Sequence, residues 1–301
     1  MALALCAVWL APGPAGALAR DRTAGAREYG IDGGRKYLLY VPRSSPATGP
    51  RPLVLFFHGG GGDMQQAAAS YGWREKAEQE GFVVAFPNGS SRLPRQRLAT
   101  WNAGDCCGYA RDRQVDDAAY VRLVLADIRR RAAIDEQRIF ATGMSNGGMM
   151  AHRLACEMAD TFLAVAAVAG TDNTAACRPS QPISVMHIHA RDDTHVLFDG
   201  GAGKDAFRDE SKVTDFTSVE TTIQRWVARN RLDTRPQRVL DVPGAYIDLY
   251  TSGRHGAQVA LVVTETGGHS WPGGKSVRGK QPSRAIIAND VIWDFFRRQQ
   301  R

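Results

Sequence analysis

One serine stands in a pattern that is typical of enzyme nucleophiles. Ser145 is the central residue of Gly-Met-Ser-Asn-Gly at 143–147, between an apolar run at 138–142 and a helix-forming segment at 146–158. This order is typical of a nucleophile elbow, a sharp strand-to-helix turn that lifts the hydroxyl off the end of a sheet. The two glycines suit such a turn because side chains there would collide with the neighbouring strand and helix. The motif predicts that Ser145 is a nucleophile.

An acid and a base follow the serine in the chain order that such a hydrolase needs. A serine hydroxyl attacks well only when a base removes its proton and an acid orients that base. In hydrolases with this elbow the acid comes second and the histidine last, each after a strand. The apolar run 183–189 leads into Asp192 and Asp193, and the run 260–264 leads into His269. Ser145, one of the two aspartates and His269 are therefore the expected triad.

Two other histidines compete with His269 for the role of base. His255 lies in Ser-Gly-Arg-His-Gly between two expected strands, which is typical of a hairpin turn. His195 follows the candidate acids too closely in sequence to be the better choice. His269 is favoured because the glycines on both sides let its loop fold back over the elbow.

Two backbone amides are expected to stabilise the oxyanion that forms during acyl transfer. One belongs to Asn146, the residue after the nucleophile, at the start of a helix. The other is expected from His-Gly-Gly-Gly-Gly at 58–62, with Gly60 as the donor. A phosphate cradle is the alternative for this glycine-rich stretch, but it fits neither Gly-x-Gly-x-x-Gly nor a P-loop.

A histidine cluster offers a metal site as an alternative chemistry. His187 and His189 would lie on the same side of one strand, shortly before His195. Arg191 stands where metallo-β-lactamase-type sites need an aspartate. Local hydrogen bonds of buried histidines are therefore the favoured interpretation, and no metal is expected.

Alternating strands and helices predict one α/β domain over residues 20–301, with a mostly parallel, doubly wound sheet covered by helices on both faces. The chain shows no internal repeat and no linker to a second folded module. The long loop 88–114 is expected to be functional or tied down. The expected strands are 37–41, 53–57, 82–86, 138–142, 162–169, 183–189, 238–242, 246–250 and 260–264, and the expected helices are 65–80, 116–132, 146–158, 218–230 and 283–298.

Composition indicates a globular, exported protein. Of the 301 residues, 44% are hydrophobic and 23% charged, which suits one large core. Residues 1–19 carry no charged side chain and end in Ala-Gly-Ala-Leu-Ala, which predicts a signal peptide and a secreted or periplasmic location. Prolines and glycines interrupt this short run, so stable membrane insertion is not expected. The net charge of +7 is spread over scattered arginines, which argues against nucleic-acid binding.

Four cysteines remain after the leader, and an even number in an exported protein predicts disulfides. They are Cys106, Cys107, Cys156 and Cys177. Sequence leaves all three pairings open. A bond between the vicinal pair would be strained, so at least one of these two is expected to pair elsewhere. Reduced, buried thiols are the alternative.

Several segments spread over most of the chain together carry a family resemblance. They are His-Gly at 58–59, Phe-Val-Val-Ala-Phe-Pro at 82–87, Trp-Asn-Ala-Gly-Asp-Cys-Cys-Gly at 101–108, Val-Asp-Asp at 115–117, Gly-Met-Ser-Asn-Gly-Gly-Met-Met at 143–150, Arg-Leu-Ala-Cys-Glu at 153–157 and Gly-His-Ser-Trp-Pro-Gly-Gly at 268–274. With them the chain resembles the α/β-hydrolase family that groups polyhydroxybutyrate depolymerases with feruloyl and acetylxylan esterases.

The resemblance implies further site residues. The family's Ile-His-Gly-Thr-x-Asp, laid on 188–193, selects Asp193 as the acid, although Ala190 and Arg191 depart from it and Asp192 stays an alternative. It also implies that Trp101 and Trp271 lie near the acyl pocket; the alternative is that both anchor loops.

The expected activity is cofactor-free hydrolysis of a carboxylic ester. The resemblance favours 3-hydroxyalkanoate polyesters or oligomers as substrate, with feruloyl or acetyl esters of plant polysaccharide as the alternative. A binding protein with a vestigial site is the alternative from a different class. Sequence leaves the oligomeric state open.

Overall fold

The computed structural model of the chain describes residues 25–31, 33–43, 49–174, 176–206, 214–252, 256–276 and 281–300. The predicted leader at 1–19 and the rival histidine His255 lie outside these residues. Within the described segments, no helix combines the length and the apolar character that crossing a bilayer requires.

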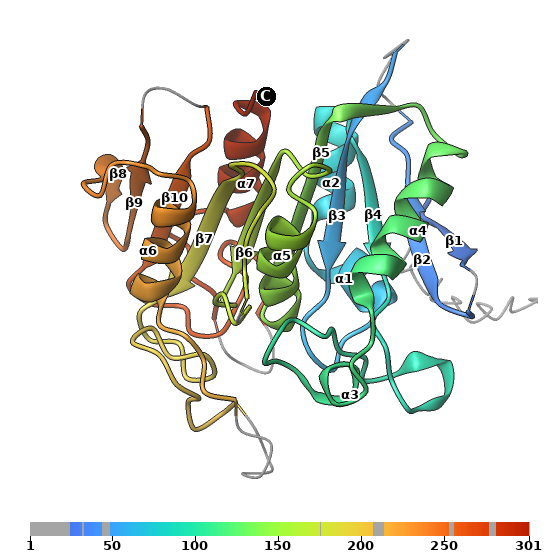
Figure 1. Cartoon of the computed structure of the whole chain (residues 1–301), viewed down its shortest axis with the longest axis horizontal. Coiled ribbons are helices and arrows are strands. Elements are labelled where there is room, and N and C mark those ends of the chain that lie inside the picture. The colour runs from blue at the N-terminus through green and yellow to red at the C-terminus, as the bar shows by residue number, and fades with distance from the viewer. Residues whose placement is uncertain are drawn as a thin grey trace, which may run out of the picture.

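The described strands form one mixed sheet of ten strands in the order β1-β2-β4-β3-β5-β6-β7-β10-β9-β8 (Figure 1). The run from β4 to β10 is parallel, and the strands at each edge are antiparallel. The strands are β1 Arg27–Gly30, β2 Lys36–Tyr40, β3 Arg51–Phe57, β4 Val83–Pro87, β5 Ile134–Met144, β6 Ala164–Val168, β7 Ser184–Ala190, β8 Gln237–Val242, β9 Ala245–Tyr250 and β10 Val259–Thr264.

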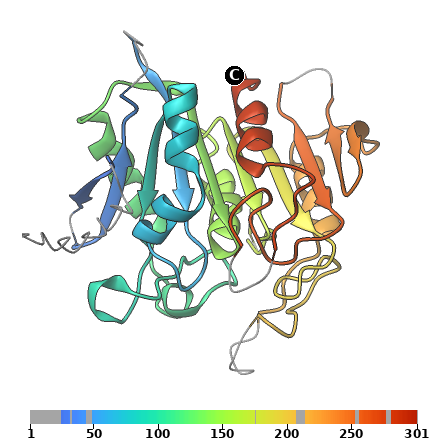
Figure 2. The ribbon, with the colours of Figure 1, turned by 180° about the vertical axis from the view of Figure 1, so that it is seen from behind.

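Helices cover both faces of the sheet. Helices α4, α5 and α6 lie on the face turned to the viewer in Figure 1, and α1, α2 and α7 lie on the opposite face, seen in Figure 2. The expectation of a doubly wound α/β sheet is therefore confirmed. The helices are α1 Met64–Ser70, α2 Trp73–Glu80, α3 Gly108–Asp112, α4 Asp117–Arg129, α5 Asn146–Glu157, α6 Val219–Arg229 and α7 Ala288–Arg297, with a 3₁₀ turn at Pro94–Gln96.

Strand β3 shows why the central strands are continuously apolar in sequence. Leu53, Leu55 and Phe57 pack into the core beneath α4 and α5, whereas Val54 and Phe56 pack into the core beneath α1, α2 and α7. Neighbouring side chains point to opposite faces of a strand, and both faces here are covered. No polar face is left to interrupt the run.

Some expected elements differ from the structure for identifiable reasons. The single helix expected at 65–80 is two helices, because Gly72 between them has φ +70°, outside the right-handed helical region. Strand β1 and the short helix α3 were not expected, since β1 is a largely exposed edge strand without an apolar run. The last helix starts at Ala288 rather than 283, because the Ser283 carbonyl accepts a hydrogen bond from Gly273 N–H (2.8 Å) instead.

The parallel strands place their carboxyl ends at one edge of the sheet. Strands β3, β5, β7 and β10 all end there, and the loops that follow them gather along the lower side of Figure 1. In open α/β sheets this edge is where ligands bind.

Candidate active site

Ser145 occupies a strained turn between β5 and α5. Its φ of +56° is unusual for a residue with a side chain, and its N–H donates to the Val168 carbonyl (2.8 Å). A side chain at Gly143 would come within 2.5 Å of the Gly147 carbonyl, and one at Gly147 would collide with the carbonyl of Phe57. The glycines thus have the steric role expected of a nucleophile elbow.

The three candidate triad residues lie in one hydrogen-bonded row. The ring of His269 has Nε2 2.8 Å from Ser145 Oγ and Nδ1 2.8 Å from Asp193 Oδ2. A carboxylate only accepts, so Nδ1 carries the proton and Nε2 is left to accept from the serine hydroxyl. This is the tautomer in which a histidine can take a proton from Ser145.

Asp193 is held as a buried anion. Its other oxygen, Oδ1, accepts the backbone N–H groups of His195 (2.8 Å) and Val196 (3.1 Å). Burial pushes the pKa of Asp193 upward, but hydrogen bonds from His189 and His269 outweigh it and hold the pKa below the usual range. The carboxylate is therefore charged at neutral pH and available to orient His269.

Asp192, the alternative acid, contacts the backbone of the same loop rather than the imidazole. It is exposed, and its oxygens accept the N–H groups of Gly268 (2.8 Å) and Gly267 (3.3 Å). The two neighbouring aspartates thus have different partners, one on the histidine ring and one on the loop that carries it.

His195 lies beside the row. Its ring stacks on that of His269 with centroids 4.5 Å apart and planes 14° from parallel. Its backbone N–H donates to Asp193 Oδ1 and so helps to hold that carboxylate. The structure therefore places His195 against the flat face of the candidate base, whereas the edge of that base faces Ser145.

The two expected oxyanion donors lie next to each other. A Cβ added to Gly60 would be 3.6 Å from Cβ of Asn146. In the same loop the Gly61 N–H donates to the Ala99 carbonyl (2.8 Å), and the Gly62 N–H donates to the Gly59 carbonyl (3.0 Å). Gly60 lies beside the start of α5, where the helix dipole also favours negative charge, and Gly59 lies beside Ser145, with an added Cβ 3.5 Å from Cβ of that serine.

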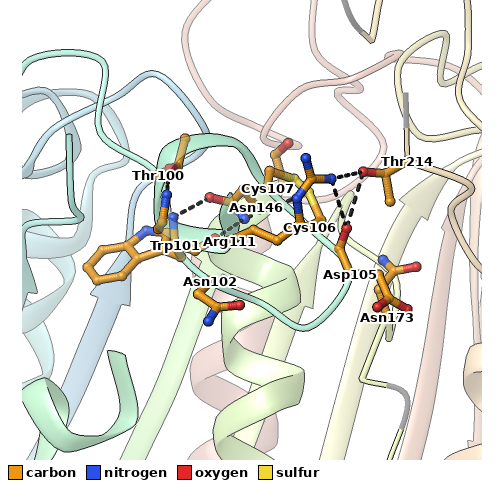
Figure 3. The surroundings of a disulfide bond; sticks show 12 residues. Thr100, Trp101, Asn102, Asp105, Cys106, Cys107, Arg111, Asn146, Asn173 and Thr214 are labelled. Carbon is orange, nitrogen blue, oxygen red and sulfur yellow. Dashed lines mark hydrogen bonds between the residues drawn. A yellow bond between two sulfur atoms is a disulfide. The ribbon is translucent and has the colours of Figure 1, made fainter. Parts of the chain in front are cut away.

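Trp101 is hydrogen-bonded to both segments that carry the expected oxyanion donors. It has no exposed surface, and its indole N–H donates to the His58 carbonyl (2.9 Å). Its backbone N–H donates to Asn146 Oδ1 (2.7 Å), and Asn146 Nδ2 donates back to its carbonyl (3.0 Å; Figure 3). This burial favours the loop-anchor role of Trp101 over direct contact with an acyl group.

Trp271 is also buried, on the opposite face of the sheet. Its indole N–H donates to Asn289 Oδ1 (2.9 Å), and its ring packs edge-on against Phe56 and Tyr71, with centroids 5.4 and 5.3 Å apart. Only 5% of Trp271 is exposed. These contacts fasten the loop that carries His269, which again favours an anchoring role.

A family model described as Esterase PHB depolymerase matches residues 35–262. The chain belongs to this esterase family. The family is one of carboxylic ester hydrolases.

Curated relatives of this esterase carry the names of several esterases. It is 27% identical to Feruloyl esterase B of Piromyces equi, over 80% of this chain and 44% of that protein. It is 30% identical to Putative esterase NocK of Nocardia uniformis subsp. tsuyamanensis, over 84% of this chain and 76% of that protein. With Probable feruloyl esterase C of Aspergillus niger it shares 28% identity, over 56% and 58%. The chain thus spans about half the length of both feruloyl esterases.

Solved structures similar to the esterase show the same fold. Acetyl xylan esterase from Aspergillus awamori matches with a TM-score of 0.57 and 14% identity, over 88% of this chain and 94% of that one. An S-formylglutathione hydrolase from Agrobacterium tumefaciens matches with a TM-score of 0.55 and 14% identity, over 91% and 96%. At this identity the likeness establishes the α/β-hydrolase fold.

The disulfide expectation for the esterase was wrong at one pair. Cys156 and Cys177 are joined, with Cα atoms 5.4 Å apart, which is normal for a disulfide. Cys106 and Cys107 lie side by side in the loop (Figure 3), and with Cys156 and Cys177 joined neither has another of the four cysteines to pair with, although at least one was expected to pair elsewhere. The reason is that Cys156 on α5 and Cys177 in the segment after β6 are bonded to each other.

The histidine cluster makes local hydrogen bonds, as expected. His187 Nε2 lies 3.0 Å from His189 Nδ1, and both rings are buried. Two residues on helices, His152 and Trp226, join this cluster. They were missed because each is a single residue on an otherwise apolar helix face, with no motif around it. Asp193, His195 and His269 are close enough to hold a metal ion together, but two of them already form the row to Ser145.

Proposed function

We propose that this protein is an exported serine esterase that hydrolyses 3-hydroxyalkanoate polyesters or oligomers through an acyl-enzyme on Ser145. The observation that carries the proposal is the hydrogen-bonded row from Asp193 through His269 to Ser145, with both links at 2.8 Å. The proposal accounts for each member of the row, because nucleophile, base and orienting acid are in contact in the required order.

Acylation begins at the serine. Ser145 Oγ attacks the ester carbonyl carbon while His269 Nε2 takes the hydroxyl proton, and the carbonyl oxygen becomes an oxyanion. The amides of Gly60 and Asn146 donate to that oxygen, and buried Asp193 stabilises the imidazolium. His269 then gives its proton to the departing alkoxide, so the alcohol leaves and the acyl group stays on Ser145.

Deacylation repeats the same steps with water. His269 takes a proton from water, and the resulting hydroxide attacks the acyl carbon. The tetrahedral intermediate collapses, Ser145 recovers the proton through His269, and the carboxylic acid leaves. No metal or organic cofactor has a role in this scheme.

The substrate class is supported by the family match, whose name refers to polyhydroxybutyrate depolymerases. The names of the curated relatives support the alternative, feruloyl or acetyl esters attached to plant polysaccharide. Hydroxyalkanoate oligomers are preferred because the family model spans residues 35–262, whereas the chain spans only 44% and 58% of the two feruloyl esterases.

A binding protein with a vestigial site is the alternative from a different class. A vestigial site has no selection for a strained serine or for two hydrogen bonds at 2.8 Å. Ser145 keeps its φ of +56° at the end of β5, which is the kind of strain that persists at functional sites. This supports an active esterase.

The test is a side-by-side assay of hydroxybutyrate oligomers, methyl ferulate and acetylated xylan, with wild type and Ser145→Ala. The expected result is the highest kcat/KM on the oligomers and at least a 10³-fold loss on every substrate in the variant. Undiminished hydrolysis by Ser145→Ala would reject the serine mechanism. A higher kcat/KM on methyl ferulate or acetylated xylan would replace the proposed substrate.

Export rests on the apolar segment 1–19 and agrees with the disulfide between Cys156 and Cys177, since such bonds persist in oxidising compartments. Expression in a bacterial host, fractionation and N-terminal sequencing test it. The expected result is a periplasmic or secreted protein whose first residue lies close to Arg20. Recovery from the cytoplasm with an intact leader would reject export.

A further inference from the structure

A row of buried nitrogen-bearing rings runs through the core and ends at the candidate acid. Trp226 Nε1 on α6 lies 3.0 Å from His152 Nδ1 on α5, and His152 Nε2 lies 3.3 Å from Nδ1 of His187 on β7. His187 Nε2 lies 3.0 Å from His189 Nδ1. His189 Nε2 then lies 3.4 Å from Asp193 Oδ2. Each ring is at least 99% buried, so its hydrogen bonds must come from within the protein.

The direction of every hydrogen bond in this row is determined at its first member. An indole N–H can only donate, so His152 must accept at Nδ1 and carry its proton on Nε2. His152 then donates to His187 Nδ1, and His187, protonated on Nε2 for the same reason, donates to His189 Nδ1. His189 is left with an Nε2–H at the far end. All three imidazoles share one tautomer.

The opposite end of the row requires the same direction. His189 Nε2 lies 2.8 Å from the Val196 carbonyl and 3.4 Å from the Asp193 carboxylate, and both of these can only accept. A reversed row would point an imidazole lone pair at two oxygens. Because both ends agree, the tautomers can be assigned from the heavy atoms alone.

His152 and His187, the two histidines in the interior of the row, are neutral. Burial lowers the pKa of His152 to about 4, and burial together with the two neighbouring histidines lowers the pKa of His187 well below 6.5. Around His152, Asp172 favours the charged ring and Arg229 opposes it. Neutral rings at these two positions, in a row whose N–H groups all point towards Asp193, stabilise a negative charge there without introducing a competing cation.

We propose that the row Trp226–His152–His187–His189 positions Asp193 for catalysis by presenting an N–H, and not a lone pair, to its Oδ2 atom. His189 contacts both the carboxylate and the Val196 carbonyl, and the Val196 N–H in turn donates to Asp193 Oδ1 (3.1 Å). The row thereby holds the carboxylate and the turn that carries it in one arrangement. This inference rests on the proposed function, in which Asp193 orients His269.

His189 is the position at which the proposal can be tested most sharply. The variant His189→Gln keeps an amide N–H that reaches as far as Nε2, whereas His189→Leu has a similar volume and no donor. A merely structural role predicts that both variants lower stability and leave the chemistry unchanged. A positioning role predicts a loss in kcat that depends on the N–H.

The expected results in the full-length enzyme, on the best ester substrate, are specific. His189→Leu lowers kcat about 10- to 100-fold with KM within twofold, as expected for a lost hydrogen bond to a charged group. His189→Gln recovers kcat to within about fivefold of wild type. A wild-type kcat in His189→Leu, or an equal loss in both variants at equal melting temperature, would overturn the proposal.

A second measurement covers the case in which His189→Leu does not fold. Nitrogen-15 NMR of the wild-type rings at pH 8 should show protonated Nε2 and unprotonated Nδ1 at His152, His187 and His189. A protonated Nδ1 at any of them would overturn the row. This NMR measurement does not depend on enzyme activity. Continued activity of Ser145→Ala would reject the proposed function but would leave the tautomer assignment unaffected.

Discussion

The side chain of Asn146 and the backbone of Trp101 form a closed pair of hydrogen bonds. Trp101 N–H donates to Asn146 Oδ1 at 2.7 Å, and Asn146 Nδ2 donates to the Trp101 carbonyl at 3.0 Å. The same tryptophan donates its indole N–H to His58, at the start of the glycine loop. One residue pair thus couples the long loop after β4 to both candidate oxyanion donors.

Asn146→Ala tests this coupling, because it removes the side chain and keeps the backbone amide. Two hydrogen-bonding groups of Trp101 lose their buried partner, which costs about 1–3 kcal/mol each when they stay unpaired. We expect an unfolding free energy lower by about 2–6 kcal/mol and a kcat lower by about tenfold. Urea unfolding and steady-state kinetics measure the two effects. A wild-type kcat in a destabilised variant would show that the pair serves stability alone.

The two neighbouring aspartates should contribute unequally to catalysis. Asp193 accepts from the His269 ring, whereas Asp192 accepts from the amides of the loop. Asp193→Asn should lower kcat by about 10⁴-fold, because the amide no longer holds the tautomer that accepts from Ser145. Asp192→Asn should lower it less than about tenfold, since it weakens only loop contacts. Kinetics of both variants at pH 7 compare them directly, and a larger loss in Asp192→Asn would transfer the role of acid to that residue.

Glycines of the elbow and of the oxyanion loop should respond differently to one added methyl group. At Gly147 the methyl group would overlap the Phe57 carbonyl, a backbone atom of a central strand. At Gly60 it would lie 3.6 Å from Asn146 Cβ, an ordinary contact. We expect Gly147→Ala to lose about 3 kcal/mol or more, and Gly60→Ala to stay within about 1 kcal/mol of wild type. Thermal unfolding tests this, and equal stability of the two variants would contradict the steric explanation.

Much of the fold and of the candidate site could be predicted from sequence because the relevant patterns are local. Ser145, Asp193 and His269 each follow an apolar strand, and parallel strands bring their carboxyl ends to one edge. The ring row could not be predicted in full. His152 and Trp226 come from different helices, and only tertiary packing brings them to the histidines of β7.

Other features escaped prediction for different physical reasons. The break between α1 and α2 depends on the left-handed conformation of Gly72, and a glycine also occurs in many continuous helices. The burial of Trp101 and Trp271 could not be predicted either, because an aromatic residue beside a catalytic motif fits both a pocket wall and a loop anchor. Their burial and their hydrogen-bond partners in the structure separate the two roles.

The buried histidines predict how stability changes with pH. Burial lowers the pKa of His58 to about 4 and that of His152 to about 4, from an ordinary 6.5. The unfolded chain therefore binds these protons near pH 6.5, while the folded protein binds them only near pH 4. The stability that these two histidines contribute is fully present above pH 6.5 and is lost as the pH drops through this window. Each such histidine contributes about 1.4 kcal/mol per pH unit to the slope.

His58→Gln isolates one of these contributions. His58 donates from Nδ1 to the Gly59 carbonyl (2.8 Å) and accepts from Gly89 N–H at Nε2 (3.0 Å), so the ring is neutral in the folded state. Glutamine can supply a donor and an acceptor but does not titrate. Urea unfolding between pH 6 and pH 4.5 should therefore give a slope that is smaller by about 1.4 kcal/mol per pH unit in the variant. Identical slopes in the variant and the wild type would mean that His58 has the same pKa in the folded and the unfolded protein. That result would contradict a neutral His58 ring beside the oxyanion loop.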